Sequence, residues 1–279
     1  MLPDFLTFTA NTKEEAISFL SAHPGTALLA GGTDLLIRMK NGETHPCLVD
    51  ITRVPQLSGV AAEDGQIRIG ACATHRSIAT EPVIASLARS LSAACSWIGS
   101  PQIRNMGTIG GNIVNASPAA DSIPPLLIHE AVLTIESQAG RTREPLEKFI
   151  VAPYKTAIGE KEILSSITID ALQGYQEGYK RVAKRAALAI SRLGIAWAFV
   201  EKDGALLDVR LAIGSCTPTP FRARNVEAFL NGRKREKRVV EEAVTLCLDE
   251  VRRISGERPS FAYKLPVVRD LLRSILGGR

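Results

Sequence analysis

Two stretches decide the fold of this chain: AGGTDLL at residues 30–36 and GTIGGNIVNASPAAD at residues 107–121. We call them the first glycine loop and the second glycine segment. Each is a run of small residues beside an apolar segment typical of a buried strand. Backbone N–H groups reach a phosphate only where no Cβ blocks the approach, and glycine leaves that space open. About 75 residues separate the two stretches, which predicts one extended ligand, such as a dinucleotide, held from two sides.

Taken alone, the first glycine loop is compatible with two interpretations. A strand, a glycine pair and a helix start can bind phosphate through backbone N–H groups and the positive helix end. A tight strand-to-helix turn without any ligand has the same pattern. The loop contains neither the G-x-G-x-x-G dinucleotide fingerprint nor the Gly-Lys-Ser/Thr of a P-loop.

The second glycine segment is more specific, because its fifteen residues are polar yet small. A solvated loop is usually more charged, whereas backbone packed against a ligand has this composition. We expect Thr108, Asn112 and Ser117 to donate hydrogen bonds to phosphate or sugar hydroxyls. We expect Asp121 to accept one from a ribose or ribityl hydroxyl. A glycine-rich loop that shapes a sheet corner is the alternative.

The composition is that of a soluble globular protein, with 45% hydrophobic and 23% charged residues in 279. This length allows two domains, each with its own core. The net charge of +5 is spread along the chain, with acidic residues close to basic ones, so nucleic-acid binding is not predicted. The five cysteines lack C-x-x-C spacing and the four histidines are scattered, which predicts buried free thiols, no metal site and no catalytic set.

The sequence contains no apolar run of the roughly 20 residues that a membrane span needs. Asp4, Glu14 and Glu15 near the N-terminus are unlike a secretory signal. With an odd number of cysteines, these features predict a cytoplasmic protein.

Hydrophobic periodicity and turn residues divide the chain into elements. Thr12 and Glu15 have a capping-box pattern that starts the first helix, and Thr74 is expected to cap a helix that begins near Arg76. Further helices are predicted at 82–96, 223–230, 239–253 and 261–276, and strands at 27–29, 47–50, 59–61, 66–70, 131–135, 163–169, 179–183, 195–201 and 207–213. A change of character near 171–178 predicts domains 1–171 and 172–279, the first divided into subdomains of about 1–55 and 56–171.

These stretches and three further motifs, in the same order, carry a family resemblance. The further motifs are EILSSI at 162–167, YKRVAKR at 179–185 and GSCTPTPFRA at 214–223. Together they resemble the FAD-binding medium subunit of the molybdenum hydroxylase family, which includes bacterial xanthine dehydrogenase and aerobic carbon monoxide dehydrogenase. The resemblance covers nearly the whole chain.

The resemblance implies an α+β fold: a two-part FAD-binding domain of the vanillyl-alcohol-oxidase type, then an α+β C-terminal domain with a three-stranded sheet and helices. Matching positions imply a pyrophosphate site at the two glycine stretches and further cofactor contacts nearby. The implied pyrophosphate residues are Leu28, Leu29, Ala30, Gly31, Gly32, Thr33, Asp34 and Leu35, with Thr108, Ile109, Gly110, Gly111 and Asn112. The implied further contacts are Thr74, His75, Ile98, Asp121, Leu164 and Lys180.

The implied function is electron transfer by non-covalently bound FAD within a complex. A small subunit would supply electrons from [2Fe–2S] clusters, and a large subunit with the molybdenum cofactor would oxidise the organic substrate, as a dimer of heterotrimers. The acceptor would be NAD or another molecule such as a quinone. Lys180, if near the flavin ring, would favour the reduced anionic form by Coulomb attraction. Two alternatives stay open: a stand-alone flavin-dependent oxidoreductase of the same fold, and a binding module without FAD.

The chain departs from the family pattern in two places. Some relatives have a cysteine-rich insertion that holds an extra iron–sulfur cluster, and this chain lacks those cysteines, which predicts no cluster here. Relatives often have an acidic residue after the basic pair that matches Lys184 and Arg185, whereas residues 186–188 here are Ala-Ala-Leu. The second departure leaves the electron acceptor open.

Overall fold

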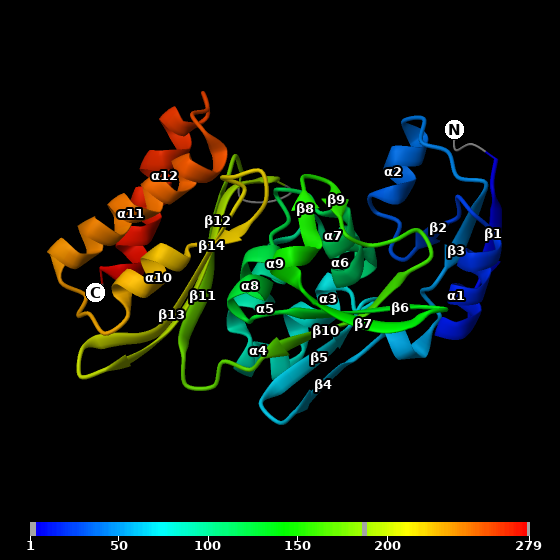
Figure 1. The fold of residues 1–279 in the computed structure, drawn as a ribbon, viewed down its shortest axis with the longest axis horizontal. Coiled ribbons are helices and arrows are strands. Elements are labelled where there is room, and N and C mark those ends of the chain that lie inside the picture. The colour runs from blue at the N-terminus through cyan, green and yellow to red at the C-terminus, as the bar shows by residue number, and fades with distance from the viewer. Residues whose placement is uncertain (1–3, 186–188, 278–279) are drawn as a thin grey trace.

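The computed structural model describes residues 4–185 and 189–277. Three units follow one another along the chain and lie side by side, from the blue N-terminal unit to the red end of the C-terminal unit (Figure 1). The two chain ends lie at opposite sides of the molecule. Residues 186–188, where the sequence departs from the family pattern, fall outside the described residues.

The N-terminal unit is a three-stranded parallel sheet with two helices. Its strand order is β1-β3-β2, with β1 at Leu6–Thr9, β3 at Cys47–Asp50 and β2 at Ala27–Leu29. Helix α1 spans Lys13–Ala22 and helix α2 spans Leu35–Lys40. Thr12 caps α1 as predicted, because its hydroxyl accepts a hydrogen bond from the Glu15 N–H. The first glycine loop connects β2 to α2.

The middle unit is a five-stranded antiparallel sheet with helices on one face. Its strand order is β4-β5-β10-β6-β7, with bounds Val60–Glu63, Gln66–Gly70, Ile163–Asp170, Val132–Ser137 and Gly140–Pro145. The helices are α3 His75–Thr80, α4 Pro82–Leu87, α5 Arg89–Trp97, α6 Pro101–Met106, α7 Ile109–Asn115, α8 Ile123–Ile128 and α9 Leu146–Phe149, with a 3-10 turn at Pro55–Leu57 and a small pair β8 Ile150–Ala152 and β9 Lys155–Thr156. Isoleucines and leucines on one sheet face form a single buried core with these helices.

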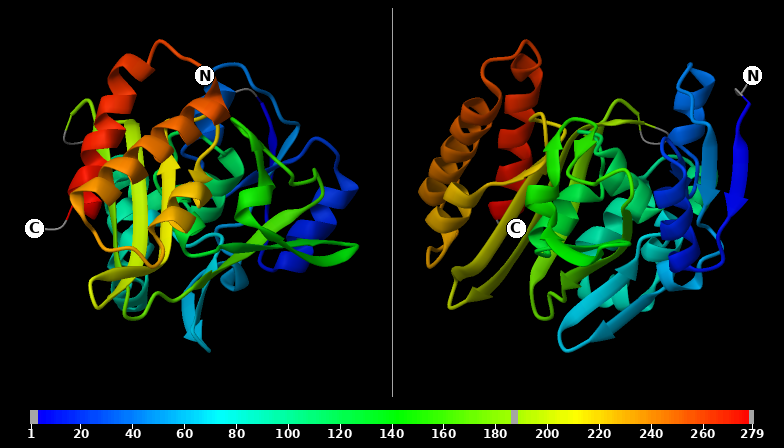
Figure 2. Two further views of the ribbon diagram at one scale, coloured as in Figure 1. Left: turned by 60° about the vertical axis from the view of Figure 1, so that its left-hand side comes forward. Right: turned by 45° about the vertical axis from the view of Figure 1, so that its right-hand side comes forward.

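The C-terminal unit is a four-stranded antiparallel sheet that lies between two helical layers (Figure 2). Its strands, in order, are β11 Gln176–Ala183, β12 Ser191–Lys202, β13 Ala205–Gly214 and β14 Phe221–Arg222. Helices α10 Arg224–Leu230, α11 Lys237–Ser255 and α12 Phe261–Leu276 cover one face. Small side chains on the other face, Ala196, Ala198 and Ala212, belong to the core of the middle unit, where α8 contacts β12 and β13.

The structure corrects three predicted elements. The helix expected at 82–96 is broken at Ala88, because the Glu177 carboxylate accepts hydrogen bonds from the N–H groups of Arg89 and Ser90 and so starts a new helix there. Half of the second glycine segment, expected as a loop, is helix α7. The C-terminal sheet has a fourth strand of two residues, β14, which is too short to produce a periodic pattern.

Candidate functional site

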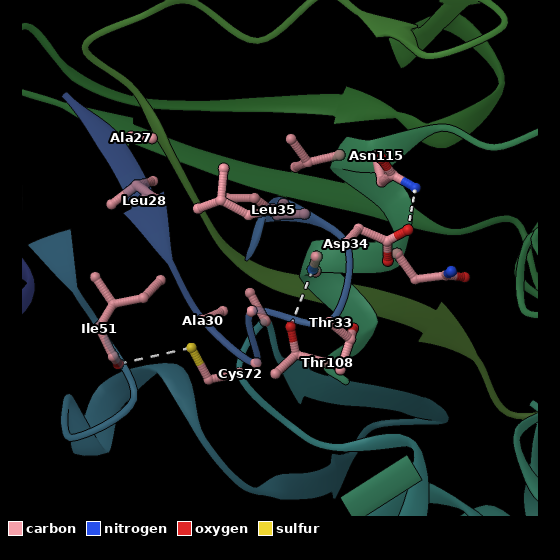
Figure 3. A pocket seen from close by; sticks show the side chains of 18 of the residues that line it. Ala27, Leu28, Ala30, Thr33, Asp34, Leu35, Ile51, Cys72, Thr108 and Asn115 are labelled. Atoms are coloured by element: carbon pink, nitrogen blue, oxygen red, sulfur yellow. Dashed lines mark hydrogen bonds between the residues drawn. The ribbon is translucent and has the colours of Figure 1, made fainter. Parts of the chain in front are cut away.

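A cavity of about 330 Å³ lies between the N-terminal and middle units. The first glycine loop forms one side, and the opposite side is α7 with the start of β10 (Figure 3). Its volume is within the range of about 300–1,000 Å³ that is usual for ligand sites. Fourteen residues predicted from the sequence line this cavity: Leu28, Ala30, Gly31, Gly32, Thr33, Asp34, Leu35, His75, Ile98, Thr108, Gly110, Gly111, Asn112 and Leu164.

The first glycine loop presents a row of backbone donors. The N–H groups of residues 31–35 donate no hydrogen bond to any other described residue. Gly32 has φ +68°, a left-handed conformation that glycine adopts without strain. Successive N–H groups around such a residue form a concave site that binds anionic oxygen atoms. This loop can therefore hold a phosphate through its backbone.

Gly31 is required for a different reason, the contact between the two glycine stretches. A Cβ at Gly31 would lie 1.9 Å from the carbonyl oxygen of Met106, which precedes the second glycine segment. A Cβ at Gly107 would lie 3.4 Å from Thr33 Oγ1. The two stretches thus pack directly on one another, and their separation is set by backbone contact.

The first three N–H groups of helix α7 are already hydrogen-bonded within the protein. Ile109 and Gly110 donate to the carbonyl oxygens of Ala73 and Ala71, at 2.9 and 2.8 Å. Gly111 donates to Thr108 Oγ1, the N-cap hydroxyl, at 3.1 Å (Figure 3). At these three positions the second glycine segment therefore has no backbone donor left for a ligand. It can contact a ligand through side-chain groups, and it leaves free space for one.

Helix α7 leaves free space at Gly111 and a free side-chain donor at Asn112. A Cβ at Gly111 would lie 2.9 Å from Thr108 Oγ1, and within 4 Å it would meet no other neighbouring segment among the described residues. Asn112 accepts a hydrogen bond from Ser122 Oγ at 2.7 Å through Oδ1, while its Nδ2 has no partner in the described part of the chain. The Asn112 amide is therefore oriented with a free donor at the cavity wall.

A polar cross-link at the cavity edge joins the first glycine loop to α7. Asn115 Nδ2 donates to Asp34 Oδ1 at 3.3 Å (Figure 3), and Arg38 Nη1 donates to Asn115 Oδ1 at 3.0 Å. Arg38 also pairs with Glu43 at 2.9 Å. Arg38 and Asn115 line the cavity although neither was predicted from the sequence. Asn115 follows Asn112 by three positions, a spacing that places both on one helix face, so a helical interpretation of this segment would have included it.

Six predicted residues lie outside the cavity lining: Leu29, Thr74, Ile109, Ser117, Asp121 and Lys180. Thr74 caps α3, as predicted, by accepting from the Ser77 N–H at 3.1 Å. Lys180 Nζ donates to Ser274 Oγ at 2.9 Å and lies 5.9 Å from the Trp197 ring centroid, within the C-terminal unit. Lys180 therefore contacts Ser274 and Trp197 in this structure and is not among the residues that line the cavity.

Asp121 makes several contacts with the C-terminal unit. Its carboxylate accepts hydrogen bonds from the Tyr179 hydroxyl and Ser191 Oγ, both at 2.5 Å, and pairs with Arg181 at 3.0 Å. Burial and the Asp121 charge raise the pKa of the Tyr179 phenol well above its ordinary value. Both carboxylate oxygens are therefore occupied by the C-terminal unit, and Asp121 connects that unit to the second glycine segment.

Residues 4–185 and 189–277 contain no group of three or more His, Cys, Asp or Glu side chains that could hold a metal ion. Across the same described ranges, no helix is long and apolar enough to cross a membrane. All five cysteines are buried and free.

Two family models together match almost the whole chain. The FAD binding domain in molybdopterin dehydrogenase matches residues 3–171, and the CO dehydrogenase flavoprotein C-terminal domain matches residues 178–277. The fold and the site thus define a flavoprotein of the molybdopterin dehydrogenase class, with FAD as its cofactor.

Individual relatives agree along their full length. The FAD-binding subunit of xanthine dehydrogenase from Escherichia coli O157:H7 is 32% identical, covering 98% of this chain and 95% of the relative. The glyceraldehyde dehydrogenase medium chain from Sulfolobus acidocaldarius is 32% identical and covers 96% of each chain. The solved carbon monoxide dehydrogenase from Hydrogenophaga pseudoflava superposes with a TM-score of 0.91 at 27% identity, covering 98% of this chain and 96% of the matched chain. This chain belongs to the family of FAD-binding medium subunits of xanthine dehydrogenase and carbon monoxide dehydrogenase, and is an oxidoreductase subunit. The resemblance is thereby confirmed for family, fold class and cofactor.

Proposed function

We propose that the cavity between the N-terminal and middle units holds FAD, with its pyrophosphate at the N–H groups of residues 31–35. The observation that carries this proposal is the row of unpaired N–H groups around the left-handed Gly32. The free space at Gly111 and the unpaired Nδ2 of Asn112 on the opposite wall support it. Leu28, Ile98 and Leu164 add apolar surface for flat ring systems.

The chain's own residues would bind and orient the cofactor and would not act on an organic substrate. FAD supplies the redox chemistry when it is bound, and the protein supplies position and electrostatics. Arg38 is the one arginine among the described residues that line the cavity, and it is paired with Glu43. The pyrophosphate would then be held mainly by neutral backbone dipoles.

We further infer that this subunit transfers electrons within a molybdenum hydroxylase complex. Electrons would come from [2Fe–2S] clusters of a small subunit, after a large molybdenum subunit has oxidised the substrate, and would pass to NAD or another acceptor. Relatives named as the medium chain of carbon monoxide dehydrogenase and the medium subunit of nicotine 6-hydroxylase support the assembly. A dimer of heterotrimers and the domain boundary near residue 171 belong to the same proposal.

The test is expression of the chain alone and together with small and large subunits. We expect the isolated chain to bind FAD and to oxidise no purine, aldehyde or heteroaromatic compound, and we expect oxidation to return on co-expression. Turnover by the isolated chain without molybdenum would instead favour a stand-alone flavin oxidoreductase. A chain that folds without any affinity for FAD would overturn the cavity assignment.

The acceptor requires a separate experiment. The FAD-loaded chain, reduced with dithionite under anaerobic conditions, is mixed with NAD or with a soluble quinone, and reoxidation is followed by flavin absorbance. Rapid reoxidation by NAD supports it as the acceptor. Reoxidation by the quinone alone would remove NAD from the proposal.

A further inference from the structure

His75 is a buried histidine beside the cofactor cavity, at the point where the two glycine stretches meet. It is the first residue of α3, its side chain lines the cavity, and only 3% of the residue is exposed. Its backbone N–H donates to the Gly107 carbonyl oxygen at 3.0 Å, which fixes the start of α3 to the second glycine segment. Buried polar side chains are normally hydrogen-bonded, so each ring nitrogen of His75 needs a partner.

The two ring nitrogens have different surroundings. Nδ1 lies 3.8 Å from Cys95 Sγ, on the fully buried face of α5. Nε2 makes no hydrogen bond to any described residue. A Cβ built at Gly107 would lie 3.3 Å from Cδ2 of His75 and 3.4 Å from Thr33 Oγ1. The Cδ2–Nε2 edge of the ring is therefore next to the contact between the two glycine stretches.

The protonation state of the ring follows from its neighbours. Burial raises the pKa of the Cys95 thiol well above its ordinary range, so this group keeps its proton and can donate S–H. Burial, with a smaller contribution from Arg104, lowers the pKa of His75 to about 4, so the imidazole is neutral at pH 7. If Nδ1 accepts from the thiol, the single ring proton must be on Nε2.

We propose that His75 donates a hydrogen bond from Nε2–H to bound FAD where the two glycine stretches meet, and that Cys95 is a positioning residue that fixes this tautomer. The inference rests on the proposed location of FAD in this cavity. A neutral donor gives direction to the contact without adding a full charge. Arg104 is engaged elsewhere, since its Nη1 donates to the carbonyl oxygens of Ile98 and Gly99.

The direct test is ¹⁵N-histidine NMR of the wild-type chain with and without FAD. The chain has four histidines, and His75→Phe assigns the relevant resonances by their loss. We expect the Nε2–H tautomer in the FAD-free protein and a shift of the Nε2 resonance when FAD is added. An Nδ1–H tautomer, or an Nε2 resonance unchanged in protein saturated with FAD, would overturn the proposal.

Variants test the contact independently. Gln can place an amide N–H near the position of Nε2, whereas Phe keeps the ring shape without a donor. Loss of one hydrogen bond corresponds to roughly 5- to 10-fold in affinity, so we expect that loss in FAD affinity for His75→Phe and less than about twofold for His75→Gln. Equal affinity for all three proteins would refute the donor role. The melting temperature of each FAD-free protein shows whether the fold is intact.

The role of Cys95 is tested by its effect on the tautomer. Cys95→Ser keeps a donor and should keep the Nε2–H form, whereas Cys95→Ala should populate the Nδ1–H form. A merely structural role for Cys95 would leave the tautomer unchanged in both. Gly111→Ala separates this inference from the FAD site itself. If that variant weakens FAD binding and His75→Phe does not, the cavity holds FAD and the inference about His75 is wrong.

Discussion

Gly111→Ala tests whether the open face of α7 contacts FAD. Gly111 is the third residue of this helix, where alanine is favoured over glycine by about 1 kcal/mol. The added Cβ would lie 2.9 Å from Thr108 Oγ1, so the N-cap hydroxyl must rotate away. Loss of such a cap costs about 1 kcal/mol. The two effects nearly cancel, and we expect the free energy of unfolding without FAD to change by less than about 1 kcal/mol.

The effect on FAD should be larger, because the methyl group enters the cavity. Forcing an extra methyl into a well-packed contact costs about 1–3 kcal/mol, which corresponds to roughly 5- to 150-fold in Kd. Titration of FAD-free protein, followed by flavin fluorescence, measures this change. Thermal unfolding of the same FAD-free samples measures the stability of the fold.

Gly110→Ala is the matched control in the same helix. Its Cβ would lie 2.7 Å from both the Cβ and the carbonyl oxygen of Ala71, inside the core, so this variant should lower the melting temperature of the FAD-free protein. Unchanged FAD affinity in Gly111→Ala would show that this face of α7 does not contact the cofactor. A large loss of stability in Gly111→Ala would show that its effect on FAD is not local.

Three further predictions concern the cofactor and the contacts between units. Acid precipitation should release free FAD into the supernatant, and flavin that stays with the protein pellet would contradict non-covalent binding. Asp121→Asn should lower the free energy of unfolding by about 3 kcal/mol in denaturant titrations, because it leaves Arg181 buried without its counter-ion; a change below about 0.5 kcal/mol would refute this. Although burial raises the pKa of Glu177, hydrogen bonds from His129 and Ser90 lower it to about 2. Its contribution to the free energy of unfolding, roughly 3 kcal/mol, is therefore fully present above the unfolded-state pKa, near 4.5, and is lost as the pH falls toward 2. Glu177→Gln should flatten the pH dependence of stability between these two values. An unchanged acid-unfolding profile in this variant would contradict the prediction.

The sequence predicted the parts of the fold that local patterns determine. The Thr12 and Thr74 caps and the three C-terminal helices all depend on residues close together in the chain. The break at Ala88 could not be predicted in this way, because the carboxylate that caps α5 belongs to Glu177, 88 residues after the Arg89 N–H that it accepts from. Helix α7 was missed because its glycines and asparagines have low helix propensity, which contacts with residues 71–73 override.

The predicted cofactor residues divide in the same way. Those in the first glycine loop could be proposed from the sequence because a glycine pair between a strand and a helix start is a local pattern that can bind phosphate. The different surroundings of Asp121 and Lys180 could not be identified, because their partners come from distant strands and helices. Ser191 lies 70 residues after Asp121, and Ser274 lies 94 residues after Lys180. A motif gives the position of such a residue, but only the packed units give its partner.

Within each glycine pair, the two residues have different tasks. The first, Gly31 or Gly110, lies where a Cβ would collide with a neighbouring backbone, at Met106 or Ala71. The second faces the site: Gly32 has the left-handed φ that turns successive N–H groups to one side, and Gly111 leaves the cavity open. Gly31 thus fixes the distance between the first glycine loop and the backbone at Met106, whereas Gly110 fixes α7 against Ala71 within the middle unit. Substitution of the first glycine should therefore destabilise the FAD-free fold, and substitution of Gly111 should act on the affinity for FAD.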